Sequence, residues 1–217
     1  MFIGHFAVGF GSKKFAPRTS LAVLVGAAVL PDVLWTVFLL CGWESVRFDP
    51  GNTRFTPLDL AYFPWSHSLL MDLVWATLSA LLYYGLTRYR PGTIAVFVAV
   101  LSHWVLDWIS HRPDMPIYPN GPKVGLGLWN WVAGTIIVEL AMFAVGAWLY
   151  FRATRGVDWV GSYGPVCFIV ALLVLYLGDR AGGTTENTTD LALSGLIGVV
   201  ALLLLAWWFD RRRSVKA

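Results

Sequence analysis

The chain has 217 residues, of which 57% are hydrophobic and 13% are charged, and its formal net charge is +3. Soluble proteins carry roughly 25% charged residues, so this composition excludes an ordinary soluble domain. The basic residues lie between apolar blocks rather than in one patch, which argues against a nucleic-acid partner. These features indicate a polytopic protein embedded in a membrane.

The apolar residues fall into blocks whose lengths are near the roughly 20 residues that a helix needs to cross a bilayer. Residues 1–10 are too short to span, and they predict an interfacial or re-entrant helix. Residues 1–217 then form one integral membrane domain, with a candidate metal-site half over 1–130 and a helical scaffold over 131–217. We therefore expect an all-α, polytopic membrane helical bundle with spans at about 19–42, 67–87, 92–111, 126–151, 158–178 and 190–209.

Basic residues flank these spans unevenly, which predicts an orientation. Five of them lie at one set of ends: Arg47, Arg54, Arg112, Lys123 and Arg180. Eleven lie at the other set: Lys13, Lys14, Arg18, Arg88, Arg90, Arg152, Arg155, Arg211, Arg212, Arg213 and Lys216. Cytoplasmic loops carry an excess of Lys and Arg, so we expect a multi-pass plasma (inner) membrane protein with both termini in the cytoplasm.

The loops on the extracytoplasmic side differ in composition. Residues 42–66 and 112–125 are rich in Pro and Gly with aromatic residues between them, which is typical of ordered irregular chain. Residues 179–189 are rich in Gly and Thr and are expected to be flexible. Trp129 and Trp131 lie at the outer end of the fourth span, where an aromatic belt is expected. The last two spans are expected to form a scaffold, or a surface that faces lipid or another copy of the chain in a homo-oligomer.

The segment from Ser102 to His111 places three ionisable groups in an apolar helix. His103, Asp107 and His111 recur at i, i+4 and i+8, so they share one stripe. His103 and Asp107 are about 6 Å apart along the axis, which suits a chelated ion or a hydrogen-bonded pair. His111 is about 12 Å from His103 and would serve a second metal, a supporting residue or a substrate phosphate. Ionisable groups at membrane depth usually mark functional sites.

Two other spans carry polar residues that are candidates for the same site. Asp32 follows Pro31, which is expected to bend the first span, and its carboxylate is either a hard ligand or a partner for a neighbouring helix. His67 lies at the outer mouth of the second span, where Ser66 is a candidate N-cap. His5 is either a ligand or a residue that hydrogen-bonds to a neighbouring helix.

Two further intramembrane carboxylates are weaker candidates for the same site. Asp72 lies about 140° around the helix from His67, so it is not expected to share a ligand set with it. Glu139 is deep in the fourth span and is a separate carboxylate. We expect structural or supporting roles for both.

The order His5, Asp32, His67 and then His103-x-x-x-Asp107 resembles the bacterial membrane-bound metal-dependent hydrolase family typified by YdjM. It is distantly similar to the zinc-dependent phospholipase C and S1 nuclease-like all-helical enzymes, in which corresponding side chains hold zinc. The resemblance implies that these five residues are metal ligands. They would hold one or two Zn²⁺ ions, with Mn²⁺ or Fe²⁺ as alternatives.

The resemblance also implies a reaction. The expected substrate is a phosphoester or ester of a membrane lipid or lipid-linked molecule, attacked by a metal-activated water. The candidate catalytic residues are His111, Arg112 and Asp114: Arg112 or Lys123 would hold a phosphate, and His111 or Asp114 would carry a proton. The phospholipase pattern ends with another His-x-x-x-Glu, and no histidine follows His111, so a full three-metal cluster is not expected.

Two non-enzymatic interpretations remain. The same groups could form an intramembrane metal-, proton- or haem-binding or transport site, with the other buried carboxylates extending a relay through the membrane. A structural or assembly protein that retains a fossil site would keep its function without His103.

Overall fold

The computed structural model describes residues 1–178 and 187–216. Its strands form three antiparallel pairs: β1 (Ser45–Phe48) with β2 (Leu58–Tyr62), β3 (Met115–Pro116) with β4 (Lys123–Val124), and β5 (Thr154–Gly156) with β6 (Arg213–Val215). Its helices are α1 (Ile3–Ser12), α2 (Leu21–Ala28), α3 (Leu30–Leu40), α4 (Pro64–His67), α5 (Leu69–Thr87), α6 (Arg90–Ser110), the 3-10 turn η1 (Leu128–Asn130), α7 (Val132–Ala153), α8 (Trp159–Gly178) and α9 (Thr188–Asp210).

The described helices confirm an all-α bundle of about six spans. Five of them, α5 to α9, are long and apolar enough to cross a membrane, and α2 with α3 makes a sixth if the pair is one span. That pair is bent by 60°. Pro31 lies in the first turn of α3, where its missing N–H is tolerated, so the chain breaks the helix before Pro31 instead of bending it gently.

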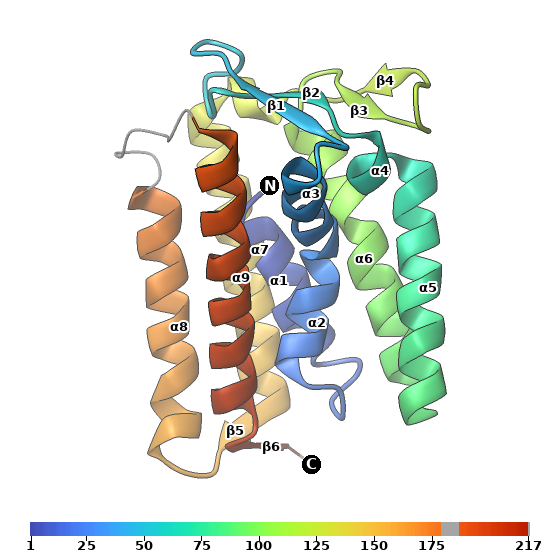
Figure 1. Ribbon diagram of the computed structural model, residues 1–217. Coiled ribbons are helices and arrows are strands. Elements are labelled where there is room, and N and C mark those ends of the chain that lie inside the picture. Colours follow the sequence, from blue (N-terminus) through green and yellow to red (C-terminus); the bar gives the residue numbers. More distant parts are fainter. Residues whose placement is uncertain (179–186, 217) are drawn as a thin grey trace.

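The short N-terminal helix lies inside the bundle rather than on its surface. α1 has ten residues, of which eight are buried, and it packs against α2, α6 and α7. Such a helix is about 15 Å long, which is too short to cross a bilayer. Figure 1 shows it in the centre of the molecule, with the spanning helices around it.

Small residues allow α1 to sit this close to its neighbours. A Cβ atom on Gly9 would lie 2.7 Å from the Cα of Val25 on α2. A Cβ atom on Gly146 of α7 would lie 2.3 Å from the carbonyl oxygen of Ala7. Close backbone approach through glycine is typical of helix packing in membranes.

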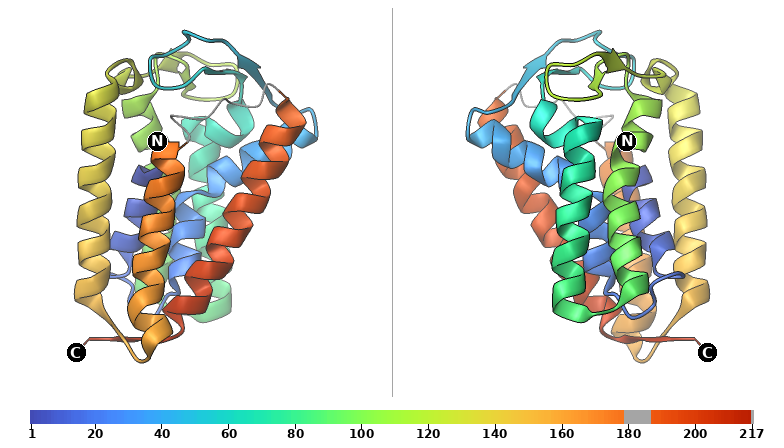
Figure 2. Two further views of the ribbon diagram at one scale, coloured as in Figure 1. Left: turned by 90° about the vertical axis from the view of Figure 1, so that its left-hand side faces the viewer. Right: turned by 90° about the vertical axis from the view of Figure 1, so that its right-hand side faces the viewer.

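The two ends of the bundle differ. The hairpins β1–β2 and β3–β4 cover one end, and the β5–β6 pair and the C-terminus lie at the other (Figures 1 and 2). The loops over 42–66 and 112–125 were expected to be irregular, but they contain these short hairpins. Most of the loop predicted over 179–189, and Arg180 with it, lies outside the described residues.

The larger set of basic residues gathers at one end of the bundle, and the side of the membrane that this end faces stays a prediction. The C-terminal ends of α1, α5, α7 and α9 lie together at the end of β5–β6 (Figure 1), and the eleven basic residues flank these helix ends and the start of α6. Met1 differs from the expectation for the termini, because it is buried next to Asp107 rather than placed at the basic end.

Candidate metal centre

Helix α6 supplies the central side chains of the candidate site. Pro91 in its first turn starts the helix, and it ends at Ser110, ahead of Arg112-Pro113. His103 and Asp107 are buried one turn apart, with His103 Nε2 3.2 Å from Asp107 Oδ2. The predicted stripe is therefore present up to Asp107.

Two more side chains reach His103 from the hairpin side. His67 ends the four-residue helix α4, and its Nε2 lies 3.3 Å from His103 Nε2. Asp32 lies in the first turn of α3, with Oδ1 3.5 Å from Nε2 of each histidine. The Asp32 side chain is 41% exposed, whereas those of His67 and His103 are at most 3% exposed. The accessible side of the cluster is therefore at Asp32.

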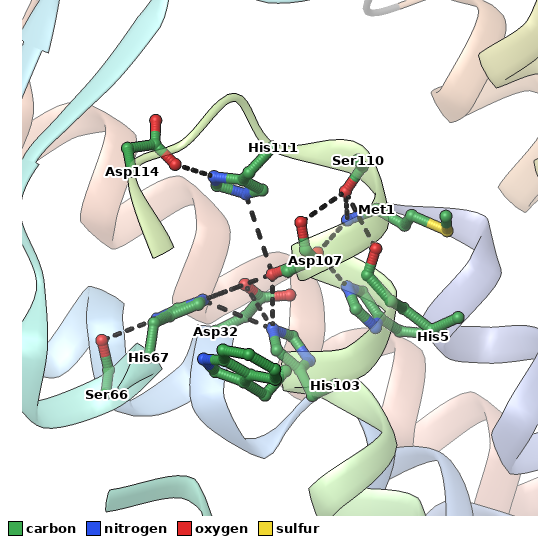
Figure 3. A network of polar contacts seen from close by, with 12 residues as sticks. Met1, His5, Asp32, Ser66, His67, His103, Asp107, Ser110, His111 and Asp114 are labelled. Atoms are coloured by element: carbon green, nitrogen blue, oxygen red, sulfur yellow. Dashed lines mark hydrogen bonds and ion pairs between the residues drawn. The ribbon is translucent and has the colours of Figure 1, made fainter. Parts of the chain in front are cut away.

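His5 joins the cluster from α1, because that helix lies inside the bundle. Its Nε2 is 3.1 Å from Asp107 Oδ1, and its ring is stacked on that of His103. The N-terminal ammonium group of Met1 donates to the same Asp107 oxygen. Figure 3 shows how these groups converge. The structure therefore brings together all five residues that the sequence pattern singled out as ligands.

The hydrogen bonds at Nδ1 fix which nitrogen of each ring is free. His103 Nδ1 is 2.9 Å from the carbonyl oxygen of Ala28, which can only accept, so Nδ1 carries the proton. His67 Nδ1 is 2.7 Å from Ser66 Oγ, and that hydroxyl donates to Glu44 Oε2 at 2.6 Å. Ser66 therefore accepts from His67 Nδ1–H. When each of these imidazoles is neutral, its Nε2 therefore keeps the lone pair and faces the cluster.

With both imidazoles neutral, four acceptor atoms meet without a donor between them. They are Asp32 Oδ1, His67 Nε2, His103 Nε2 and Asp107 Oδ2, and five of their separations are 3.2, 3.3, 3.5, 3.5 and 3.8 Å. Ligands about 2.0–2.1 Å from a tetrahedral Zn²⁺ ion are about 3.3 Å from one another. These atoms and their five separations are therefore compatible with ligation of one metal ion.

The fit favours one ion over two. The described residues contain two groups of three possible ligands: His5, His103 and Asp107, and Asp32, His67 and His103. Both groups need His103, whose Nδ1 is already bonded to Ala28. One free nitrogen binds one ion, so the two groups cannot both be complete.

His111 lies just outside the end of α6, in extended conformation. Its Nδ1 donates to Asp114 Oδ1 at 3.0 Å, and its Nε2 faces Asp107 Oδ2 at 3.9 Å. Arg112 is 2.6 Å from Asp59 and 3.2 Å from Asp114, so its guanidinium group is engaged in ion pairs. The three candidate catalytic residues thus form one chain beside the cluster.

Three other residues that the sequence singled out do not belong to this chain of contacts. Lys123 is exposed on β4. Asp72 is buried, and neither of its carboxylate oxygens has a hydrogen-bond partner among the described residues. Glu139 Oε2 accepts from the backbone N–H groups of Phe2 and Gly4, so it caps the start of α1. This contact supports the expected structural role for Glu139.

Sequence reasoning missed three contributors. Glu44 is 4% exposed and accepts from the backbone N–H groups of Trp65 and Ser66, each at 2.8 Å. Burial raises the pKa of Glu44. Ser66 is not the expected N-cap, because Ser68 caps α5 by accepting from Met71 N–H. No local signal sets Glu44 apart in the sequence, because the same loop also carries Arg47, Asp49, Arg54 and Asp59.

Trp129 is the third contributor. Its ring lies 4.2 Å from that of His111, centroid to centroid, so it packs against the candidate proton carrier. Trp131 is 64% exposed, as a residue of an aromatic belt should be. A Trp near the end of a span can belong to an aromatic belt or pack inside the protein. The sequence pattern is the same in both cases, so it could not tell Trp129 from Trp131.

Comparison with known proteins gives one match. A family model described as YdjM inner membrane protein matches residues 59–183, which is more than half of the chain. The matched segment includes His67, His103 and Asp107, and it begins after His5 and Asp32. No curated protein and no solved structure matches the chain.

Proposed function

The chain belongs to the YdjM inner membrane protein family, and on that premise we propose that it is a membrane-embedded metal-dependent hydrolase. It is a multi-pass protein of the inner membrane, and its helices enclose the buried cluster. One observation carries the proposal: two imidazole nitrogens and two carboxylate oxygens converge within 3.2 to 3.8 Å in the five separations between them that the structure gives. A cation is the simplest partner for such a set.

The ligands of this cation would be Asp32, His67, His103 and Asp107. Two imidazoles and two carboxylates suit Zn²⁺, with Mn²⁺ and Fe²⁺ as alternatives. His5 would support the site by holding Asp107 Oδ1, since residues that orient a ligand tune metal affinity. Asp32 is the ligand on the accessible side, so it is the one best placed to make room for water or substrate.

Bound there, the metal would supply Lewis-acid chemistry and activate a water for hydrolysis. His111 is positioned to hold or move the proton. Its Nδ1–H is fixed by Asp114, which leaves Nε2 with a lone pair on the side of the cluster. Arg112 holds Asp114 in place, and its side chain is 37% exposed. A substrate phosphate could therefore approach Arg112 only by competing with Asp59 and Asp114.

The substrate proposed is a phosphoester or ester of a membrane lipid or lipid-linked molecule. The cluster lies among helices that are apolar enough to span a membrane, with most of its atoms buried. An amphiphile can place its ester group at this depth while its acyl chains stay in the bilayer, whereas a fully polar substrate would lose its hydration.

Purified protein in lipid–detergent micelles, assayed against short-chain phospholipids and 4-nitrophenyl esters, tests this function. Chelator should abolish hydrolysis and Zn²⁺ should restore it. His111→Gln should lower the rate by about 100-fold or more without loss of metal, whereas Lys14→Gln, which removes an exposed charge at the other end of the bundle, should leave the rate unchanged. Hydrolysis that is insensitive to chelator and to His111→Gln would contradict the proposal.

A second function is favoured by one observation. Asp72 is buried on α5 and both its carboxylate oxygens lack a hydrogen-bond partner within the described chain. Such a group could receive a proton from the cluster, as in a non-enzymatic metal- or proton-transport protein. Proteoliposomes distinguish the two: metal-driven proton flux that Asp72→Asn abolishes, with no hydrolysis, would favour transport.

A further inference from the structure

We infer that Glu44, acting through Ser66, sets the tautomer of His67 and so turns the Nε2 lone pair of His67 toward the cluster. This inference deepens the proposed function and rests on it for its consequence, which is metal affinity. Glu44 does not touch the cluster itself. It is a positioning residue.

The two oxygens of Glu44 have different partners. Oε1 accepts two backbone N–H groups, from Trp65 and Ser66, each at 2.8 Å. This fixes the carboxylate at the start of α4 and leaves Oε2 for the Ser66 hydroxyl at 2.6 Å. A charged oxygen acceptor at that distance makes a short, strong hydrogen bond.

The Ser66 hydroxyl can then only accept a hydrogen bond from its other neighbour, His67. It has a single proton, and that proton is given to Glu44. Toward His67, 2.7 Å away, it can only accept, so His67 must carry its proton on Nδ1. Ser66 is fully buried, and with Glu44 ionised a different arrangement would leave a buried polar atom unpaired.

The substitution E44Q should reverse this chain of hydrogen bonds. In this variant the side-chain amide oxygen takes over the two backbone N–H groups, which turns the amide NH₂ toward Ser66. The hydroxyl accepts from the amide and donates to His67 Nδ1. The proton of His67 then moves to Nε2, where it faces Asp107 and His103 and blocks ligation.

The experiment measures the tautomer directly in metal-free protein. Histidine labelled with ¹⁵N is incorporated into the full chain, and solid-state NMR spectra are recorded in lipid bilayers at about pH 8, well above the usual pKa of histidine. The chain has four histidines, so His67→Ala assigns the signal. Wild type should show His67 protonated on Nδ1, and E44Q should show it protonated on Nε2.

Zn²⁺ affinity is the second readout, measured by competition with a chromogenic chelator. E44Q should bind Zn²⁺ about 10- to 100-fold more weakly than wild type. E139Q is the matched control, because Glu139 also accepts two backbone N–H groups but its carboxylate bonds to no histidine. S66T keeps the hydroxyl and should behave as wild type, whereas S66A should lose the preference for Nδ1–H.

The results separate this inference from the proposed function. His67 protonated on Nε2 in wild type, or on Nδ1 in folded E44Q, overturns the inference whatever the metal content. The expected tautomers in a protein that binds no Zn²⁺ support the inference and contradict the proposed function. The wild-type spectrum needs no variant, so the inference is tested even if E44Q does not fold.

Discussion

The imidazole rings of His5 and His103 are stacked almost in parallel, with centroids 3.7 Å apart and 8° between their planes. His103 belongs to a spanning helix, whereas His5 belongs to α1, which is held inside the bundle. The position of α1 between α2, α6 and α7 therefore determines whether His5 reaches Asp107. The geometry of the cluster thus depends on how this short helix packs.

Gly146→Ala should displace α1. A Cβ atom at this position would lie 2.3 Å from the carbonyl oxygen of Ala7, and a backbone atom cannot swing away as a side chain can. We expect a loss of about 1–3 kcal/mol in the free energy of unfolding. Gly85→Ala is the control, because no atom lies within 4 Å of its Cβ position. Thermal unfolding in detergent measures both, and equal transition temperatures would contradict the packing described.

Lys13→Met should destabilise the basic end of α1. Lys13 Nζ is 2.7 Å from Asp210 Oδ2, and the same carboxylate accepts from Tyr150 and the Leu21 backbone. Both charges are buried, and removing one partner of a buried pair costs about 3–5 kcal/mol. The neighbouring Lys14 is exposed, so Lys14→Met should be nearly neutral. Similar destabilisation by both variants in denaturant titrations would refute a special role for Lys13.

His5→Asn should weaken metal binding less than His103→Gln does. His103 has its free nitrogen at the centre of the four acceptors, whereas His5 contacts only the other oxygen of Asp107. Loss of such a supporting residue costs about 10- to 100-fold in affinity, and loss of a ligand should cost more. Zn²⁺ competition titrations give the order, and a larger effect of His5→Asn would make His5 a ligand.

Asp158→Asn should reduce stability in a pH-dependent way. The pKa of Asp158 is lowered by the Gly161 backbone N–H and by Arg212. Its ionised form is favoured in the folded state, so its contribution is present above the ordinary value of 3.8 and is lost as pH falls through the lowered pKa. The transition temperatures of wild type and variant should therefore differ at neutral pH and converge in acid. Asp190→Asn, at the start of α9, controls for the loss of one carboxylate. A difference in transition temperature between wild type and Asp158→Asn that widens in acid would contradict the predicted direction of the pH dependence.

Much of the fold could be predicted from the sequence because membrane spans are set by length and apolarity. The six spans follow from that rule, with ends displaced by a few residues. The break before Pro31 was underestimated as a bend, because the sequence does not show how the two halves pack. The interior position of α1 could not be derived either, since it depends on glycines meeting backbone from distant segments.

The ligand candidates could be predicted because ionisable side chains are rare in apolar segments. Their supporting partners could not. Glu44 lies in a loop, far in sequence from α6, and its role depends on how the chain turns back at Ser66. Trp129 was assigned to an aromatic belt, although it packs on His111. Such contacts are tertiary, and no local pattern encodes them.

Metal content tests the central claim most directly. Detergent-purified wild type, His103→Gln and Asp107→Asn would be reconstituted with Zn²⁺, Mn²⁺ or Fe²⁺, passed through a desalting column and analysed by plasma mass spectrometry. A single metal centre predicts about one metal ion per wild-type chain and a loss of that ion in both variants. A folded wild-type protein that retains no metal under any of these conditions would contradict the metal centre and, with it, the proposed hydrolase.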